Sequence, residues 1–141
     1  MGNEKEDKLK EVIYRDRDML NKGDFDMIDE LYSEDYIEPY SGVKGREGAR
    51  QEFIETKKGF PDLTFTIEDT IVKGNVIVTR YTITGTHRGA FKGIPPTGKT
   101  FKVMAITIDR IEGGKFVEHW SLYDIFSMLV QLGVKEVPQG F

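Results

Sequence analysis

The sequence predicts an α+β fold in which helices come first and a long antiparallel β-meander follows. Through residues 5–58 the apolar side chains recur at helical spacing, whereas from Leu63 onward they alternate with polar ones, as in strands that bury one face. Glycine-containing turns separate the alternating runs, so successive strands are expected to pair as hairpins. We expect the whole chain, residues 1–141, to form a single domain.

The elements are expected in a simple order, helices before strands. The expected helices are residues 5–21, a short helix that carries Met27, Ile28 and Leu31 behind an Asp24 or Asp26 cap, and residues 45–58 with Gly59 after the last turn. The expected strands are residues 36–38, 63–72, 76–86, 101–111 and 115–123, with a short terminal helix behind the last one.

Composition excludes several classes of function. The formal net charge of -4 argues against a nucleic-acid partner, because such proteins normally present a basic face. No apolar run approaches the ~20 residues that span a membrane, and the charged N-terminus is unlike a signal peptide, so a cytoplasmic location is expected. The chain has no cysteine, and its two histidines lack close ligand spacing, so we expect no metal.

One glycine-rich stretch matches a nucleotide-binding pattern by its letters alone. Residues 93–100, GIPPTGKT, fit G-x-x-x-x-G-K-[ST], a loop that cradles phosphates with backbone N–H groups and leads into a helix. Pro95 and Pro96 remove two of those donors, and the residues that follow alternate like a strand. We therefore expect a connection between two strands.

The last strand and the helix behind it carry the strongest candidate site. Glu118, Trp120 and Asp124 share one face if the strand stays regular, since alternate residues point the same way. A carboxylate beside a large aromatic side chain is a usual construction for an acid or base with a raised pKa. The alternative, which the spacing alone favours, is that Trp120 belongs to the core and Asp124 caps the helix.

Other candidates lie nearby or on neighbouring strands. His119 would face the opposite side of a regular strand, although a bulge could reverse that. Arg80 could neutralise a pocket carboxylate, but a pair with Glu68 across the hairpin is favoured. For His87, a hydrogen bond that fixes the next loop is favoured over a ligand contact. The remaining candidates for pocket lining are aromatic or apolar: Tyr14, Tyr36, Tyr40, Phe53, Phe60, Met104 and Trp120.

Several short motifs, each weak alone, occur in an order that is specific as a set. They are FPDL at 60–63, GTHRG at 85–89, GIPPTGK at 93–99, GK at 114–115, EHW at 118–120 with Asp124, and QLG at 131–133. With these motifs the chain resembles the SnoaL-like polyketide cyclases over nearly its whole length. The resemblance implies the cone-shaped fold of the nuclear-transport-factor-2-like superfamily, a strongly curved antiparallel sheet wrapped around helices that encloses an apolar pocket.

The resemblance also implies an activity. Characterised cyclases of this family close a ring by an intramolecular aldol reaction without a metal or organic cofactor, and an aspartate on the last strand serves as acid and base. By motif position that residue looks like Asp124. Many relatives carry a histidine where this chain has Pro39, and Glu38 could supply a substitute carboxylate beside Asp124. Relatives commonly dimerise through the outer sheet face, so a homodimer is expected.

We therefore expect a cofactor-free cyclase or isomerase that acts by acid–base chemistry on a small hydrophobic carbonyl compound. The alternative is a non-catalytic protein of the same fold that binds a small hydrophobic ligand. A third reading, epoxide hydrolysis, would need Arg80 and Glu38 to converge on one water. The expected catalytic residues are Asp124 and His119, and the expected substrate-binding residues are Trp120, Glu38, Arg80, His87, Tyr14, Tyr36, Phe53 and Met104.

Overall fold

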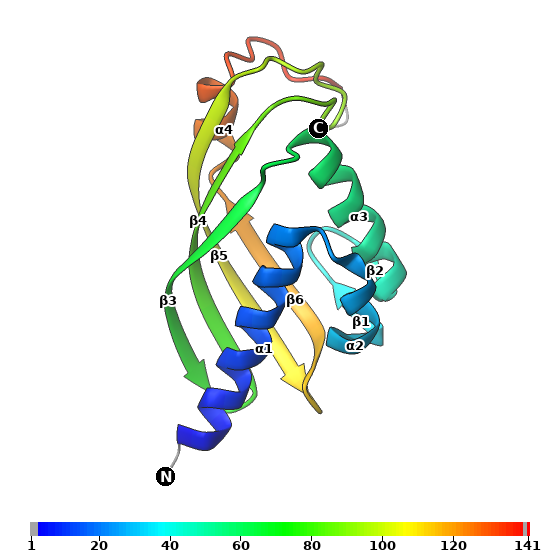
Figure 1. The fold of residues 1–141 in the computed structure, drawn as a ribbon, viewed down its shortest axis with the longest axis vertical. Helices are drawn as coiled ribbons and strands as arrows, with labels where there is room; N and C mark the ends of the chain where they lie inside the picture. The colour runs from blue at the N-terminus through cyan, green and yellow to red at the C-terminus, as the bar shows by residue number, and fades with distance from the viewer. Residues whose placement is uncertain (1–2, 140) are drawn as a thin grey trace.

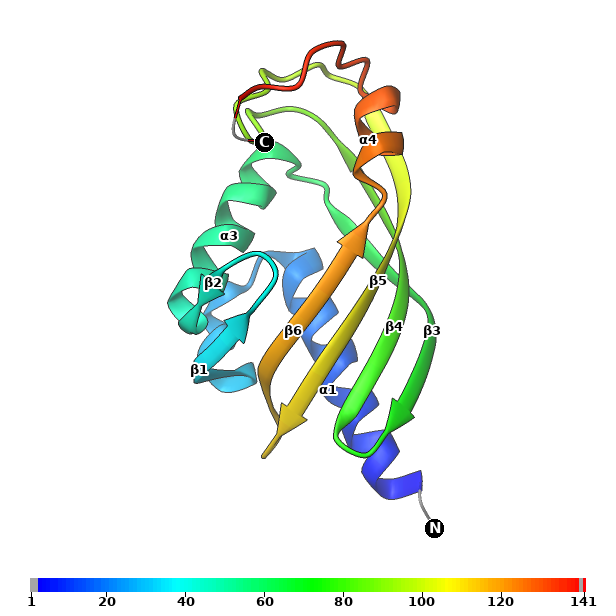
Figure 2. The same ribbon diagram turned by 180° about the vertical axis from the view of Figure 1, so that it is seen from behind.

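In the computed structural model, which describes residues 3–139 and 141, a curved sheet carries α1 and α3 on one of its faces (Figure 1). Within the described residues the sheet has six strands in the order β2-β1-β6-β5-β4-β3. Figure 2 shows β5 and β6 from behind, with α4 at the end of the strands. The elements are α1 (Asn3–Lys22), η1 (Phe25–Met27), α2 (Ile28–Leu31), β1 (Tyr32–Glu38), β2 (Val43–Lys44), α3 (Gly45–Gly59), β3 (Thr64–Lys73), β4 (Val76–Thr86), β5 (Thr100–Glu112), β6 (Lys115–Tyr123) and α4 (Ile125–Gln131).

The expected α+β fold is confirmed, and two local features differ from the sequence prediction. Strand β1 begins at Tyr32 and pairs in parallel with β6, whereas the other pairs are antiparallel. The register of β1 shifts between Tyr32 and Ile37, which breaks the two-residue alternation that would have revealed the whole strand. The short strand β2 has only two residues and no pattern of its own. No helix in the described part of the chain is long and apolar enough to cross a membrane.

Strand β5 shows how the sheet divides into two faces. Buried and exposed side chains alternate along it, because successive residues of a strand point to opposite sides. We call the side with Thr107 and Asp109 the covered face, since these residues are buried beneath the helices, and the side with Ile106 and Ile108 the outer face, since these are exposed. Residues directly opposite in the β5–β6 register share a face, so His119 is on the covered face with Asp109.

Two apolar clusters fill the covered face and leave a polar band between them. One cluster joins α1, α2 and β1 to the end of the sheet that carries Ile77 and Ile111. The other joins α4 and the loops at the opposite end to Tyr81 and Ala105. Along β4 and β5, Thr79 and the residues opposite it lie between the two clusters. The interior of the fold is therefore not uniformly apolar.

The connection between β4 and β5 contains the GIPPTGKT sequence and leads into a strand, as predicted, instead of a helix. His87 is fully buried at its start, and its Nδ1 accepts a hydrogen bond from the Thr97 backbone N–H at 3.3 Å. Its ring stacks on Phe60 with 5.2 Å between centroids. His87 therefore fixes this loop, the role that the sequence favoured, and burial keeps the pKa of His87 below its ordinary value.

Candidate functional site

Strands β5 and β6 bring a histidine and an aspartate together on the covered face. His119 Nδ1 lies 2.5 Å from Asp109 Oδ1. Burial by itself lowers the pKa of His119, but the charge and the hydrogen bond of Asp109 raise it, and the net pKa lies above its ordinary value. Because Nδ1 is engaged with Asp109, Nε2 is the ring nitrogen left to meet a ligand.

Helix α1 places a buried ion pair against the same strands. Asp16 and Arg17 are adjacent in sequence, both are buried, and Arg17 Nη1 contacts Asp16 Oδ2. Asp16 Oδ1 also accepts a hydrogen bond from the Tyr32 hydroxyl at 2.6 Å. The Arg17 guanidinium lies over the ring of Tyr81, 4.3 Å from its centroid. Burial raises the pKa of Asp16 although the charge of Arg17 opposes this.

The polar band contains buried atoms that lack hydrogen-bond partners among the described residues. Such atoms are rare in folded proteins, because each one costs its desolvation free energy without compensation. Their concentration between α1, β4 and β5 marks this band as a candidate site. The atoms are Arg17 Nε, Thr79 Oγ1, Tyr81 Oη, Thr107 Oγ1 and Asp109 Oδ2.

Two carboxyl groups approach His119 from β1 and α3. Glu38 is buried, and accepts hydrogen bonds from the Tyr36 hydroxyl at 2.7 Å and from the Ser41 hydroxyl at 2.8 Å. Glu52 Oε2 is buried without a hydrogen-bond partner among the described residues. Burial first, and then the charge of Glu38, raises the pKa of Glu52, while His119 opposes the rise. Glu38 and His119 therefore act on the protonation of Glu52 in opposite directions.

The covered face is open to solvent beside this cluster. Ser121 and Tyr123 follow His119 on β6 and lie opposite Thr107 and Ala105, which puts them on the covered face. Both are nevertheless exposed. Burial, and then the charge of Glu52, raise the pKa of the Tyr123 hydroxyl. Ser121 and Tyr123 therefore mark where the His119 side of β6 meets solvent.

Asp124 lies elsewhere, outside the helical cover. It is exposed and caps α4: Oδ1 accepts from the Ser127 backbone N–H at 3.1 Å and Oδ2 accepts from the Ser127 hydroxyl at 2.6 Å. These hydrogen bonds hold the pKa of Asp124 below its ordinary value, so the expectation of a pKa raised by burial is wrong. Asp124 lines an open hollow of about 390 Å³ with Arg80, Thr82 and Met104 of the outer face.

Replacement of Asp124 by alanine is expected to lower the melting temperature, because the first turn of α4 loses the acceptor for its free N–H group. Asp124→Asn keeps an acceptor and should melt close to wild type. The lowered pKa means that the cap stabilises the fold above the ordinary range of an aspartate and loses this effect as the pH falls through the folded pKa. Melting curves at pH 7 and pH 3 check this; a pH-independent difference between Asp124→Ala and wild type would contradict the cap.

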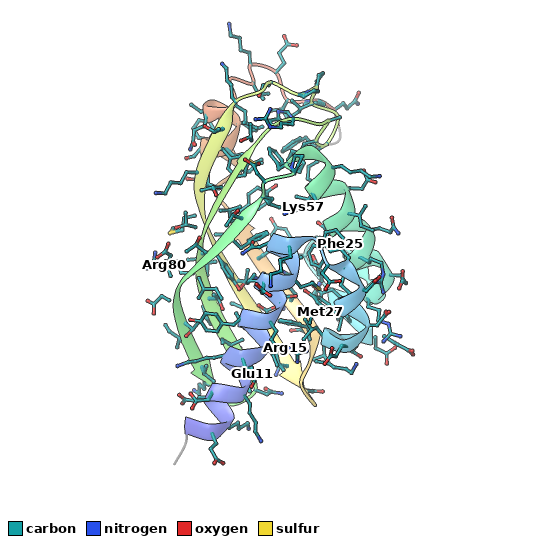
Figure 3. All side chains as sticks on the ribbon, viewed as in Figure 1. Glu11, Arg15, Phe25, Met27, Lys57 and Arg80 are labelled. Atoms are coloured by element: carbon teal, nitrogen blue, oxygen red, sulfur yellow. The ribbon has the colours of Figure 1, made fainter. Side chains whose placement is uncertain are left out.

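The other expected site residues divide between the two faces. Trp120, Arg80 and Met104 are exposed on the outer face, where Figure 3 shows Arg80 projecting away from α1. Arg80 does not pair with Glu68, which accepts a hydrogen bond from Thr82 instead. Because Glu38 is buried beneath the helices, it converges neither with Arg80 nor with Asp124.

The aromatic candidates also separate. Tyr14 was expected to line the pocket, but it is 56% exposed on α1 and does not line the covered face. Tyr40 is exposed as well, whereas Phe60 is buried against His87. Tyr36 is buried next to the site through its hydrogen bond to Glu38, and Phe53 packs on the main apolar cluster.

The sequence prediction missed four of the ionisable residues of the candidate site on the covered face. Asp109 stands at a position of β5 where the alternation calls for an apolar residue, and this is a signal that could have been used. Asp16 and Arg17 lie on the buried side of α1 beside Ile13 and Leu20, a second usable signal. For Glu52 the sequence offers no such signal, because it follows Gln51 and precedes Phe53 in an ordinary amphipathic pattern.

The curved six-stranded sheet, with helices and ionisable side chains on its covered face, assigns the described residues to the α+β class of folds. Comparison of the sequence with known families then identifies the family. The model of the SnoaL-like polyketide cyclase family matches residues 10–132, so the chain belongs to that family. Among curated proteins none matches the chain. Among the described residues, no group of three or more His, Asp or Glu is arranged to hold a metal ion.

Solved structures agree with this assignment. TsrD from Streptomyces laurentii is 31% identical, with a TM-score of 0.83 over 89% of this chain and 95% of that one. IdmH from Streptomyces antibioticus, described as a candidate polyketide cyclase, is 32% identical with a TM-score of 0.79 over 89% and 99%. AclR from Streptomyces galilaeus, described as a candidate hydroxylase, is 27% identical with a TM-score of 0.79 over 93% and 85%. The family and these neighbours support a function of the cyclase or isomerase kind.

Proposed function

We propose that this protein is a cofactor-free cyclase or isomerase that performs acid–base chemistry on a small hydrophobic carbonyl compound at the covered face. The observation that carries the proposal is the contact between His119 Nδ1 and Asp109 Oδ1, which are 2.5 Å apart, and the charge of this histidine also acts on Glu52. A histidine oriented by a carboxylate is a standard arrangement for moving protons in enzymes. Asp124 has no catalytic part in this proposal.

The reaction needs one base and one acid, and the pKa shifts of Glu52 and His119 suit these two roles. Enolisation needs a base near the carbon next to the carbonyl and an acid near the carbonyl oxygen. Glu52, with a raised pKa, is a stronger base than an ordinary carboxylate once it is ionised. His119, whose pKa is also raised, stays cationic over more of the neutral range and can donate from Nε2.

In the proposed reaction, Glu52 removes a proton from the carbon next to one carbonyl, and the enolate charge is stabilised by the His119 cation. The enolate carbon forms a bond to a second carbonyl carbon of the same molecule, whose oxygen takes a proton from His119. The proton on Glu52 then returns to His119 through solvent. The product is an isomer of the substrate, so no oxidant or other reactant is consumed.

Exchange of the α-protons of 1-tetralone in D₂O, followed by proton NMR, tests this proposal without the natural substrate. The wild-type protein should accelerate the exchange, and Glu52→Gln should reduce the acceleration by about 10²-fold or more. Glu55→Gln is the matched control, since Glu55 is exposed on the same helix and pairs with Lys58. If 1-tetralone binds but its exchange is not accelerated, the non-catalytic ligand-binding alternative is favoured instead.

We also propose a homodimer that forms through the outer face. The support is a set of exposed apolar side chains on β3, β5 and β6, an arrangement that monomeric proteins usually avoid. Sedimentation equilibrium at micromolar concentration should give twice the 16.1 kDa chain mass, whereas a monomer mass would contradict the proposal. The exposed residues are Ile71, Met104, Ile106, Ile108, Trp120 and Leu122.

A further inference from the structure

The Asp109 carboxylate has unequal surroundings at its two oxygens. Oδ1 is engaged by His119, whereas Oδ2 is buried and has no hydrogen-bond partner among the described residues. Arg17 is a cation buried on the same covered face, and its Nε is also buried without a hydrogen-bond partner in the described part of the chain. Arg17 cannot easily turn away, because Asp16 holds one end of its guanidinium and Tyr81 lies flat beneath it.

We infer that Arg17 is a positioning residue of the site: held by Asp16 and Tyr81 on the covered face, its charge acts on the proton that His119 carries beside Asp109. Arg17 does not touch the reacting atoms in the proposed reaction. It adjusts the acid that does. The inference gives the proposed function a means of setting the protonation of its acid, and in that sense it rests on that function.

The charges around His119 make Arg17 distinctive. The ionisable groups that act on this imidazole come from four elements. All but one are carboxyl groups, which favour the cationic ring when ionised, and the exception is Arg17, which disfavours it. The groups are Asp109 of β5, Asp16 and Arg17 of α1, Glu38 of β1 and Glu52 of α3.

Two substitutions on α1 should therefore move the proton affinity of His119 in opposite directions. Arg17→Met removes the opposing cation, so His119 should hold its proton to a higher pH. Asp16→Asn removes the anion that compensates Arg17, so the cation acts more strongly and His119 should lose its proton at a lower pH. A purely structural role for the pair predicts no such opposition, because loosened packing would move both variants the same way.

NMR titration of ¹³C-labelled histidine in the full chain tests the inference, with His119 assigned by its loss in His119→Gln. The expected midpoint rises by about half a pH unit or more in Arg17→Met and falls by a similar amount in Asp16→Asn. Arg15→Met is the control: Arg15 directly precedes the buried pair, its side chain is 38% exposed and pairs with Glu30, and its replacement should leave the midpoint unchanged.

An unchanged midpoint in both variants, or shifts in the same direction, would overturn the inference. If Arg17→Met fails to fold, Asp16→Asn decides alone, since a rise or no change there is incompatible with it. The titration needs no substrate. A failure of the 1-tetralone assay therefore counts against the proposed function but not against the role of Arg17. A failure of the titration counts against the role of Arg17 but not against the proposed function.

Discussion

Replacement of His119 by glutamine is expected to lower the rate of 1-tetralone α-proton exchange by about 10²-fold or more, the usual loss when a general acid is removed. Glutamine keeps hydrogen-bonding capacity beside Asp109 but cannot carry the cationic charge that stabilises an enolate. The fold should persist, because His119 is only partly buried. Glu118→Gln is the matched control, since Glu118 precedes His119 on the same strand and lies on the outer face.

The pH profile gives this prediction a second readout. Exchange by the wild-type protein needs Glu52 ionised and His119 protonated, so the rate should rise through the pKa of Glu52 and fall through that of His119. Both pKa values are raised, Glu52 above 4.5 and His119 above 6.5, which moves the active range toward higher pH. In His119→Gln, the residual exchange rate should not fall as the pH rises through the range in which wild-type His119 loses its proton. A profile with the same fall in that variant would contradict the assignment of His119 as the acid.

Replacement of Arg17 by methionine is expected to cost about 3–5 kcal/mol of unfolding free energy, measured by urea denaturation. The reason is that Asp16, whose side chain is 0% exposed, would lose its cation while remaining buried. Protonation of Asp16 can relieve part of the cost, since burial already raises its pKa. The loss should therefore be smaller at acidic pH than at pH 7.

Arg15→Met supplies the comparison on the same helix. Arg15 pairs with Glu30 at 2.8 Å, but the two side chains are 38% and 64% exposed. Exposed pairs of this kind contribute less than about 1 kcal/mol, because solvent screens their attraction. Equal losses for Arg15→Met and Arg17→Met would show that the buried pair has no special importance for stability.

Much of the fold could be predicted from the sequence, because its signals are periodic. The ranges expected for β4 and β6 match the observed bounds, and the helix expected at 45–58 corresponds to α3. Strand periodicity also showed that Trp120 and His119 face opposite sides of β6. What periodicity cannot say is which of two faces the helices cover. In residues 118–123 of β6, Trp120 is on the outer face and His119 is on the covered face, so for this part of the strand the more apolar side is not the inner side.

The candidate site was harder to predict because its members come together only through tertiary packing. Asp109 and His119 meet through strand register, which depends on the bulge between Arg110 and Ile111. Asp16 reaches the same band from a helix that is distant in the sequence. Asp124, in contrast, has the local sequence of a helix cap, and that local reading describes its contacts correctly.

The most direct test of the site assignment compares His119→Gln with Asp124→Asn in the 1-tetralone exchange assay, each corrected for its folded fraction. The covered-face site predicts that His119→Gln loses nearly all of the acceleration and that Asp124→Asn retains the wild-type rate. Loss of exchange in Asp124→Asn together with a normal rate in His119→Gln would contradict it and place the chemistry at the exposed cap of α4.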